Sequence, residues 1–267
     1  MPELPDVEIF KRRLARHGLR KKITHVAVGD SRILGTLSAR KLNSRLLGRQ
    51  LVSTRRHGKH LLAKIGGDGW LTLHFGLTGG LQFFKAPASR PPFTRVCLDL
   101  AGGEHLAYTN KRMIGRVGLA EDARAFIAHE KLGPDALDRR FGTAVFRKAV
   151  AGVRRDVKSV LMDQEILAGV GNIYADEILF RARIDPRTRI DKIEAPELSR
   201  LYRTIRAVLK TAISRGAGSE QFAERMPKGS LLPMRKKGGR CPRCGRPLKT
   251  IKSGGRTTYF CAGCQKR

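Results

Sequence analysis

The chain has 267 residues, of which 41% are hydrophobic, so it is long enough for two domains and a smaller appendage. Lys and Arg number 54 against 23 Asp and Glu, and the resulting net charge of +31 is spread along the sequence. Such an excess repels itself in a compact fold and predicts a polyanionic partner, with nucleic acid favoured. The sequence has no apolar run of about 20 residues, which argues against a membrane-spanning helix and a membrane partner.

The first eight residues, MPELPDVE, carry the most specific chemistry. A small second residue normally permits removal of Met1, which leaves Pro2 as a terminal secondary amine. A terminal amine titrates near 7.7–8.0, so about a tenth or more is neutral at pH 7 and able to attack a sugar carbon. Glu3 can move the protons of an elimination that cuts the strand. The same eight residues are also typical of a helix start, with Pro5 in the first turn and acidic residues at the positive end of the helix dipole.

A basic amphipathic helix follows, and residues 23 to about 120 then contain short β runs broken by glycine and polar turns. These runs predict an antiparallel sandwich or barrel: ITHVAVG, LLAKI, WLTLHF, LQFF, RVCLDL and RVGLA. Helical periodicity returns near Asp122 and continues to about Arg215, with apolar residues at helical spacing from Leu198 to Ala212. Residues 216–240 are rich in glycine, lysine and arginine without periodicity and predict a loop.

The central sequence LAGVGNIYADEILFRA places Gly169, Gly171 and Asn172 directly before a predicted helix. Free backbone amides at a helix start can bind a phosphate, with Asn172 as the helix cap and a side-chain donor. An ordinary turn and cap fits the same letters. Lys158, one predicted helix earlier, is similarly ambiguous. Arg256, which follows a Gly-Gly turn, is either a phosphate ligand or a solvated side chain.

Four of the five cysteines form two pairs near the C-terminus with the spacing C-x2-C-x16-C-x2-C: Cys241, Cys244, Cys261 and Cys264. This spacing presents four thiolates to one tetrahedral ion, so we expect one structural zinc ion with no open coordination position. Two disulfides are the alternative, but the acidic N-terminus does not match a secretory signal and predicts a cytoplasmic protein. The fifth, Cys97, lies in an apolar run and is interpreted as a core residue.

MPELPDVE, GVGNIYADE and the two CxxC pairs, in this order over essentially the whole chain, resemble the bacterial formamidopyrimidine-DNA glycosylases and the related endonuclease VIII enzymes. The resemblance implies a multidomain α+β fold. Residues 1–132 would form a catalytic β-sandwich headed by a helix, residues 133–225 a helix-two-turn-helix domain, and residues 226–267 a loop and a zinc-ribbon finger. A monomer that acts on damaged double-stranded DNA is implied as well.

The implied activity is that of a bifunctional DNA glycosylase and lyase of base-excision repair. Pro2 would be the Schiff-base nucleophile, Glu3 the catalytic acid and base, and Lys59 a lysine near the lesion phosphate that assists catalysis. Strand cleavage would follow by β,δ-elimination. The start PELP resembles the branch that excises oxidised purines, including 8-oxoguanine and formamidopyrimidines. Oxidised pyrimidines are alternative substrates, and a zinc-ribbon protein that binds damaged DNA without chemistry is an alternative of another class.

The resemblance also implies contacts with a duplex from which the damaged nucleotide is everted. Asn172 and Arg256 would hold the phosphates on either side of that nucleotide, and Lys158 is a further DNA-binding candidate. The loops HFGLTGGL and YTNKRMIGR match those that fill the hole in the duplex. They nominate three residues: Leu77, Arg112 and Ile114.

The sequence departs from the family pattern at several positions, three of which are the most informative. Asp6 stands where the family has glutamate, and Ile114 stands where an aromatic residue is common. MRKKGGR precedes the first zinc cysteine, where relatives carry Tyr-Gly-Arg. Because segment 216–240 contributes a lesion-capping loop in relatives, this last departure bears on the preferred lesion and opposite base rather than on the reaction type.

Overall fold

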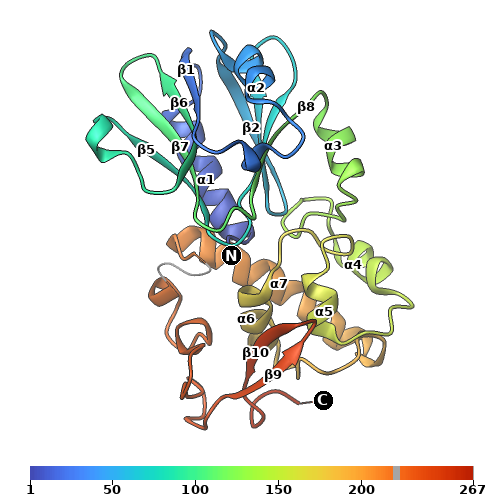
Figure 1. Cartoon of the computed structure of the whole chain (residues 1–267). Helices are drawn as coiled ribbons and strands as arrows, with labels where there is room; N and C mark the ends of the chain where they lie inside the picture. The colour runs from blue at the N-terminus through green and yellow to red at the C-terminus, as the bar shows by residue number, and fades with distance from the viewer. Residues whose placement is uncertain (219–222, 267) are drawn as a thin grey trace. The chain divides into compact units, whose positions relative to one another are not determined.

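The computed structural model describes residues 1–218 and 223–266, and the chain divides into two compact units (Figure 1). The first unit comprises Met1–Pro2 and Val7–Glu130, and the second comprises Glu3–Asp6 and the residues from Lys131 onward. The α-helices are α1 (Leu4–His17), α2 (Ala39–Leu46), α3 (Ala123–His129), α4 (Thr143–Val150), α5 (Val157–Met162), α6 (Asn172–Ala182) and α7 (Ala195–Arg215). The short 3-10 helices are η1 (Ser31–Leu34), η2 (Pro87–Ser89), η3 (Ile190–Lys192), η4 (Ala223–Arg225) and η5 (Leu232–Met234).

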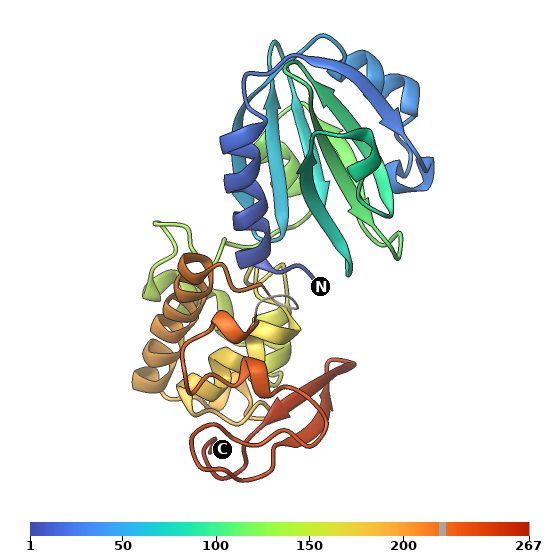
Figure 2. The ribbon, with the colours of Figure 1, turned by 90° about the vertical axis from the view of Figure 1, so that its left-hand side faces the viewer.

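Eight of the strands belong to the first unit, which is a sandwich of two antiparallel sheets (Figure 2). The strands are β1 (Ile23–Val28), β2 (Leu51–His57), β3 (His60–Ile65), β4 (Trp70–His74), β5 (Gly79–Phe84), β6 (Thr94–Leu100), β7 (Glu104–Asn110) and β8 (Arg116–Ala120). One sheet has the order β1-β6-β7-β5 and the other the order β2-β3-β4-β8. Alternate residues of each strand point inward, so Val96, Leu98 and Leu100 of β6 join Val7 and Leu14 of α1 in one core.

The predicted β-sandwich headed by a helix is confirmed, although two strands and one helix were not predicted. Most residues of β2, LVSTRRH, and of β7, EHLAYTN, are polar or charged. The alternation of apolar and polar residues that indicates a strand is therefore not visible in these two sequences. α2 buries only Leu42 and Leu46 along its length. Two apolar residues four positions apart are too few to produce a clear helical period in the sequence.

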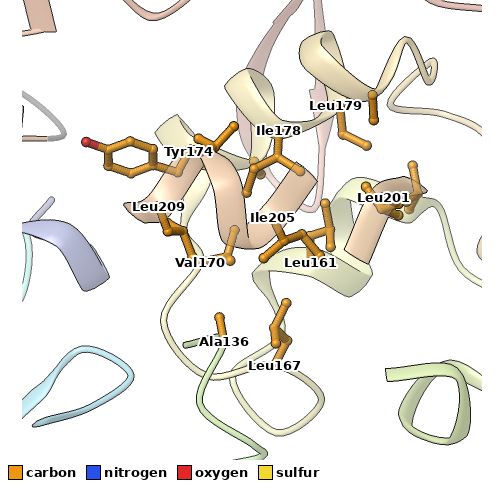
Figure 3. Packing of buried hydrophobic residues seen from close by; sticks show 14 of the residues in the cluster. Ala136, Leu161, Leu167, Val170, Tyr174, Ile178, Leu179, Leu201, Ile205 and Leu209 are labelled. Atoms are coloured by element: carbon orange, nitrogen blue, oxygen red, sulfur yellow. The ribbon is translucent and has the colours of Figure 1, made fainter. Parts of the chain in front are cut away.

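The core of the second unit lies between α6 and α7 (Figure 3). Tyr174 and Ile178 of α6 are fully buried there together with Leu201, Ile205 and Leu209 of α7. The predicted apolar period therefore faces this core. None of the helices in the described part of the chain combines the length and the apolar composition needed to cross a bilayer.

The C-terminal segment forms a two-stranded ribbon, with β9 (Lys249–Ser253) paired to β10 (Arg256–Phe260). Gly254 and Gly255 form its tip with φ values of 54° and 71°. Left-handed backbone at both central residues gives a tight hairpin turn that suits the strand twist, and glycine adopts it without strain. The sequence predicts a zinc-ribbon hairpin with its tip near residues 253–255, and the structure contains this hairpin.

Segment 216–240, which was predicted to be a loop, includes residues 219–222, which lie outside the described residues. The described remainder contains η4 and η5 and is anchored to α6. The backbone amide of Leu232 donates to Oε2 of Glu177 at 2.8 Å, and Nε of Arg235 lies 2.8 Å from Oδ2 of Asp176. Both carboxylates are buried, so these contacts fix the path of the segment toward the ribbon.

Candidate active site

The carboxylate of Glu3 lies at the first turn of α6 and is fully buried. One oxygen accepts hydrogen bonds from the backbone amides of Gly171 at 2.8 Å and Tyr174 at 3.2 Å. The other accepts from the amide of Ile173 at 2.8 Å. The positive end of the helix dipole also stabilises negative charge at this position. The structure therefore fixes the carboxylate of Glu3, the residue that follows Pro2 in the sequence, at the start of α6.

The two glycines before α6 provide the space for this arrangement. A Cβ on Gly171 would lie 2.5 Å from Cδ of Glu3, and one on Gly169 would lie 2.5 Å from Cδ1 of Leu4. Gly169 also has a φ of 118°, and its carbonyl accepts a hydrogen bond from the amide of Leu4 at 3.0 Å. A side chain at either position would push the N-terminal segment out of its place.

Two expectations about the glycine motif are wrong. Gly171, rather than Asn172, is the N-cap residue of α6, because the Glu3 carboxylate takes the amides that a cap side chain would bind. For the same reason the amides of Gly171, Ile173 and Tyr174 bind a carboxylate of this chain instead of a phosphate. Asn172 is the first residue of α6, and its Oδ1 accepts a hydrogen bond from Nζ of Lys158 at 2.8 Å.

Asp6 also stabilises the backbone of the N-terminal segment. Its Oδ2 accepts a hydrogen bond from the backbone amide of Glu3 at 2.8 Å. An aspartate three residues after its partner amide matches the geometry of a helix-start capping contact. The shorter carboxylate at position 6 therefore still reaches the backbone that carries Glu3.

Lys158 is buried with no exposed surface and bridges three elements. Its Nζ donates to Oδ1 of Asn172 at 2.8 Å and to Oγ1 of Thr258 in β10 at 2.7 Å. It also forms an ion pair with Oδ1 of Asp176 at 2.6 Å. Burial lowers the pKa of Lys158, while the charge of Asp176 opposes the shift. We therefore reassign Lys158 from DNA binding to the positioning of Asn172 and the ribbon.

Asp176 completes this buried network with its second oxygen. Oδ2 accepts from Nε of Arg235 at 2.8 Å and from the backbone amide of Tyr259 at 3.0 Å. One carboxylate on α6 thus ties together α5, the segment before the cysteines, and the ribbon. A buried charge without its partners costs several kcal/mol, so these segments depend on one another.

Replacing Lys158 with methionine should lower the free energy of unfolding by about 3–5 kcal/mol, because it leaves the buried Asp176 without its closest cation. Chemical denaturation measures the change. Lys210→Met is the matched control, because Lys210 is exposed on α7, and its effect should stay within about 0.5 kcal/mol. Equal stability of the two variants would show that the bridge contributes little to folding.

Arg256 is exposed at the start of β10, directly opposite Ser253 in the ribbon register. The hydroxyl of Ser253 donates to Oδ1 of Asp156 at 2.7 Å, and the hydroxyl of Ser159 donates to Oδ2 at 2.6 Å. Asp156 is the N-cap residue of α5, so the ribbon tip is tied to the start of that helix. Arg256 is consequently presented from a fixed hairpin, and Lys158 joins the same hairpin to Asn172.

The four C-terminal cysteines gather in one cluster, in which all four sulfur atoms lie within 4.8 Å of one another. Sγ of Cys241 is 3.8 Å from Sγ of Cys264, and Sγ of Cys244 is 3.5 Å from Sγ of Cys261. Disulfide sulfurs are separated by about 2.05 Å, so the disulfide alternative is wrong. A tetrahedral ion bound at about 2.3 Å separates its sulfurs by about 3.8 Å. The cluster therefore fits one metal ion held by these residues.

In the first unit, the structure brings Leu77, Arg112 and Ile114 into neighbouring loops. Leu77 lies in the turn between β4 and β5, and Arg112 and Ile114 lie between β7 and β8. The amide of Arg112 donates to Oγ1 of Thr78 at 3.1 Å. A Cβ on Gly76 would lie 2.5 Å from the backbone of Ile114. The two loops thus pack closely, and Arg112 and Ile114 are exposed.

Lys59 occupies the tight turn between β2 and β3 and is largely buried. Beside it, burial lowers the pKa of His60 to about 3 and that of His74 to about 4, and the charge of Lys59 contributes to both shifts. Both imidazoles are therefore neutral at physiological pH. The same hairpin is tied to α1, because Nε of Arg56 lies 3.1 Å from Oε2 of Glu8.

Sequence comparisons match all three parts of the chain to one family. The family model described as the formamidopyrimidine-DNA glycosylase N-terminal domain matches residues 1–117. The formamidopyrimidine-DNA glycosylase H2TH domain matches residues 132–224, and the zinc finger found in FPG and IleRS matches residues 238–267. Formamidopyrimidine-DNA glycosylase from Geobacter metallireducens is 38% identical over 99% of this chain and 100% of the relative. The enzyme from Moorella thermoacetica is 37% identical over 94% of this chain and 95% of the relative.

The chain belongs to the formamidopyrimidine-DNA glycosylase family. Solved structures agree with this assignment. Lactococcus lactis Fpg in complex with DNA containing an abasic site has a TM-score of 0.87 at 27% identity, covering 99% of this chain and 100% of that chain. The same protein in complex with DNA containing FAPY-dG has a TM-score of 0.88 at 27% identity with the same coverage. The chain is accordingly a DNA glycosylase of base-excision repair with the sandwich, H2TH and zinc-finger parts of its family.

Three residues of this glycosylase were missed by sequence reasoning, namely Asp176, Arg235 and Thr258. Asp176 stands in a helix next to another acid, which is the ordinary pattern of a solvated helix face. Arg235 is one of many cations in segment 216–240, and Thr258 is an ordinary strand residue. These residues matter because they surround the buried Lys158. No local pattern in the sequence indicates that this lysine is buried.

Proposed function

We propose that this glycosylase excises oxidised purines and cleaves the abasic strand by β,δ-elimination, using Pro2 as the nucleophile. The observation that carries the proposal is the fixed, buried carboxylate of Glu3 at the start of α6, in the residue bonded to Pro2. After removal of Met1, the amine and the carboxylate belong to adjacent residues. Such a pair supplies a nucleophile and a proton carrier together.

The proposed reaction proceeds through one covalent intermediate between Pro2 and the sugar. The neutral nitrogen of Pro2 attacks C1′, and the bond from C1′ to the base breaks, with its electron pair leaving on the base. The new ammonium gives its proton to Glu3, which passes it to O4′ as the sugar ring opens and an iminium forms. The iminium acidifies C2′, so loss of that proton expels the 3′ phosphate. Loss of a proton from C4′ then expels the 5′ phosphate in a second elimination, and water hydrolyses the iminium to free the nitrogen of Pro2.

The surface residues support a role in holding everted DNA. Arg112 and Ile114 are exposed on packed loops. The apolar Ile114 can replace the lost stacking, while the guanidinium of Arg112 can donate hydrogen bonds to the orphaned base. Asn172 and Arg256 are proposed as phosphate ligands, joined through Lys158 and the ribbon. Lys59 is proposed to assist near the lesion phosphate. We further propose that the ion of the four-cysteine site is zinc, which fits the sulfur spacing and lends the ribbon its order.

Damage-containing duplexes in the related structures support the substrate class. The proteins of those structures are bound to DNA with an abasic site and with FAPY-dG. Single-turnover excision should be faster on 8-oxoguanine or formamidopyrimidine duplexes than on a duplex with an oxidised pyrimidine. Identical abasic duplexes serve as the control for the elimination steps. A faster reaction on the oxidised pyrimidine would reassign the substrate, and no cleavage of abasic DNA would remove the lyase from the proposal.

A further inference from the structure

A mixed set of metal-binding side chains lies on the sheet β1-β6-β7-β5, outside the groups described above. Cys97 and Asp99 belong to β6, and His105 of β7 is paired directly with Asp99. One ligand atom from each of the three lies within 4.8 Å of the other two. Nδ1 of His105 is 2.6 Å from Oδ1 of Asp99, and Sγ of Cys97 is 3.8 Å from the same oxygen.

All three side chains project from the same face of the sheet. Leu98 of β6 and Leu106 of β7 point into the sandwich core, so the residues next to them point outward. Cys97 is 3% exposed, and it therefore forms the floor of the cluster. The side chains of Asp99 and His105 are 33% and 21% exposed, so an ion can reach them from solvent.

A further imidazole lies on the neighbouring strand, outside the close cluster of three, and its side chain would have to turn toward them to become a fourth donor. His25 of β1 is paired with Asp99 on the side opposite His105, and it is exposed. Residues directly opposite on antiparallel strands have Cβ atoms about 4.5–5.5 Å apart. Three neighbouring strands therefore carry His25, Asp99 and His105 side by side. Cys97 lies two residues before Asp99 on the central strand, β6.

The thiol of this cluster is not suited to act as a nucleophile. Burial raises the pKa of Cys97 to about 11, the charge of Asp99 adds to the shift, and Arg90 opposes it. The thiol donates to the carboxylate of Asp99 rather than to an imidazole. Binding of a metal ion to this sulfur would displace the thiol proton.

Thiolate, imidazole and carboxylate together are donors typical of zinc. The thiolate of Cys97 and the carboxylate of Asp99 neutralise the two charges of the ion, which offsets the nearby positive charge of Arg90. A tetrahedral ion about 2.0–2.3 Å from each donor separates the donors by about 3.3–3.8 Å. The spacing from Sγ of Cys97 to Asp99 already fits. The partly exposed imidazole of His105, which stacks on Phe84, has to move slightly away from the carboxylate.

We propose that Cys97, Asp99 and His105, with His25 as the fourth donor, form a second zinc site in the sandwich, distinct from the four-cysteine site. Bound there, the ion would join β1, β6 and β7 across the outer face of their sheet. The inference concerns the sandwich alone and is independent of the proposed catalytic residues. Its competitor is an ordinary Asp99–His105 ion pair above a buried cysteine.

The test measures the zinc content of the whole protein, by mass spectrometry, after dialysis against buffered micromolar zinc. The wild type should hold one ion in addition to that of the four-cysteine site. His105→Ala and Cys97→Ser should each lose this additional ion. His129→Ala is the matched control, because His129 is a largely exposed histidine of α3 and should keep both ions. Cobalt substitution should give a thiolate charge-transfer band that is weaker in Cys97→Ser than in the wild type.

Because Cys97 is buried, its serine variant could misfold, and the partly exposed His105 provides the independent variant. A wild type that saturates with the ion of the four-cysteine site alone would overturn the proposal. So would a His105→Ala variant that keeps the additional ion, or equal loss of zinc from His105→Ala and His129→Ala, which would indicate unspecific surface binding. Excision by His105→Ala should equal that of the wild type, so failure here leaves the proposed function untouched.

Discussion

Replacing Glu3 with glutamine should slow base excision by about 10²–10⁴-fold while leaving affinity for a lesion-containing duplex nearly unchanged. Glutamine keeps the length of the side chain but can neither accept nor pass on the proton of the attacking amine. It also turns one –NH2 group toward the helix start, where the amides of Gly171, Ile173 and Tyr174 all need an acceptor. Single-turnover excision and equilibrium binding to the same 8-oxoguanine duplex measure the two quantities separately.

Asp6→Asn is the matched control for this variant. Asparagine keeps an oxygen that accepts the hydrogen bond from the amide of Glu3, so excision should change by less than about tenfold. If Glu3→Gln instead loses binding and excision in the same proportion, Glu3 positions the DNA and does not transfer protons.

Borohydride should trap the wild-type protein on an abasic duplex through the nitrogen of Pro2, and Pro2→Leu should abolish this adduct. A large second residue prevents removal of Met1, so the terminal amine moves one residue outward, by about 3.3–3.6 Å. A displacement of this size removes a nucleophile from attack distance. Gel electrophoresis quantifies the adduct, and peptide mass spectrometry identifies the nitrogen that carries the sugar.

Pro5→Ala provides the control for Pro2→Leu, because it changes a proline of the same segment without moving the amine. Its adduct should form at nearly the wild-type rate. The intact mass of each protein reports whether Met1 is absent. A wild type that retains Met1 and still cleaves abasic DNA at full speed would exclude Pro2 as the nucleophile.

Features carried by neighbouring residues were predictable from the sequence. The period from Leu198 to Ala212 predicted α7, and the cysteine spacing predicted a cluster that the structure brings within 4.8 Å. The turn residues Gly254 and Gly255 predicted the ribbon tip. Each of these signals depends on a local period or a local backbone requirement, which a single sequence records directly.

Features that depend on distant contacts were not predictable. The hydrogen bond between Glu3 and Gly171 spans 168 residues, and that between Lys158 and Thr258 spans 100 residues. The local sequence favours Asn172 as the N-cap residue of α6. The side chain of Glu3 instead binds the backbone amides that such a cap would bind. Lys158 was equally misleading, since a lysine is normally exposed and only its pairing with Asp176 permits burial.

The buried carboxylate of Asp176 has a consequence for how the protein responds to its surroundings. Because it fastens Lys158, Arg235 and the backbone of Tyr259 at once, disorder that begins at the cysteines spreads to Asn172 at the opposite end of the same network. Given the proposed role of Asn172 as a phosphate ligand, metal starvation would weaken binding of the DNA backbone without changing the chemistry of the terminal amine.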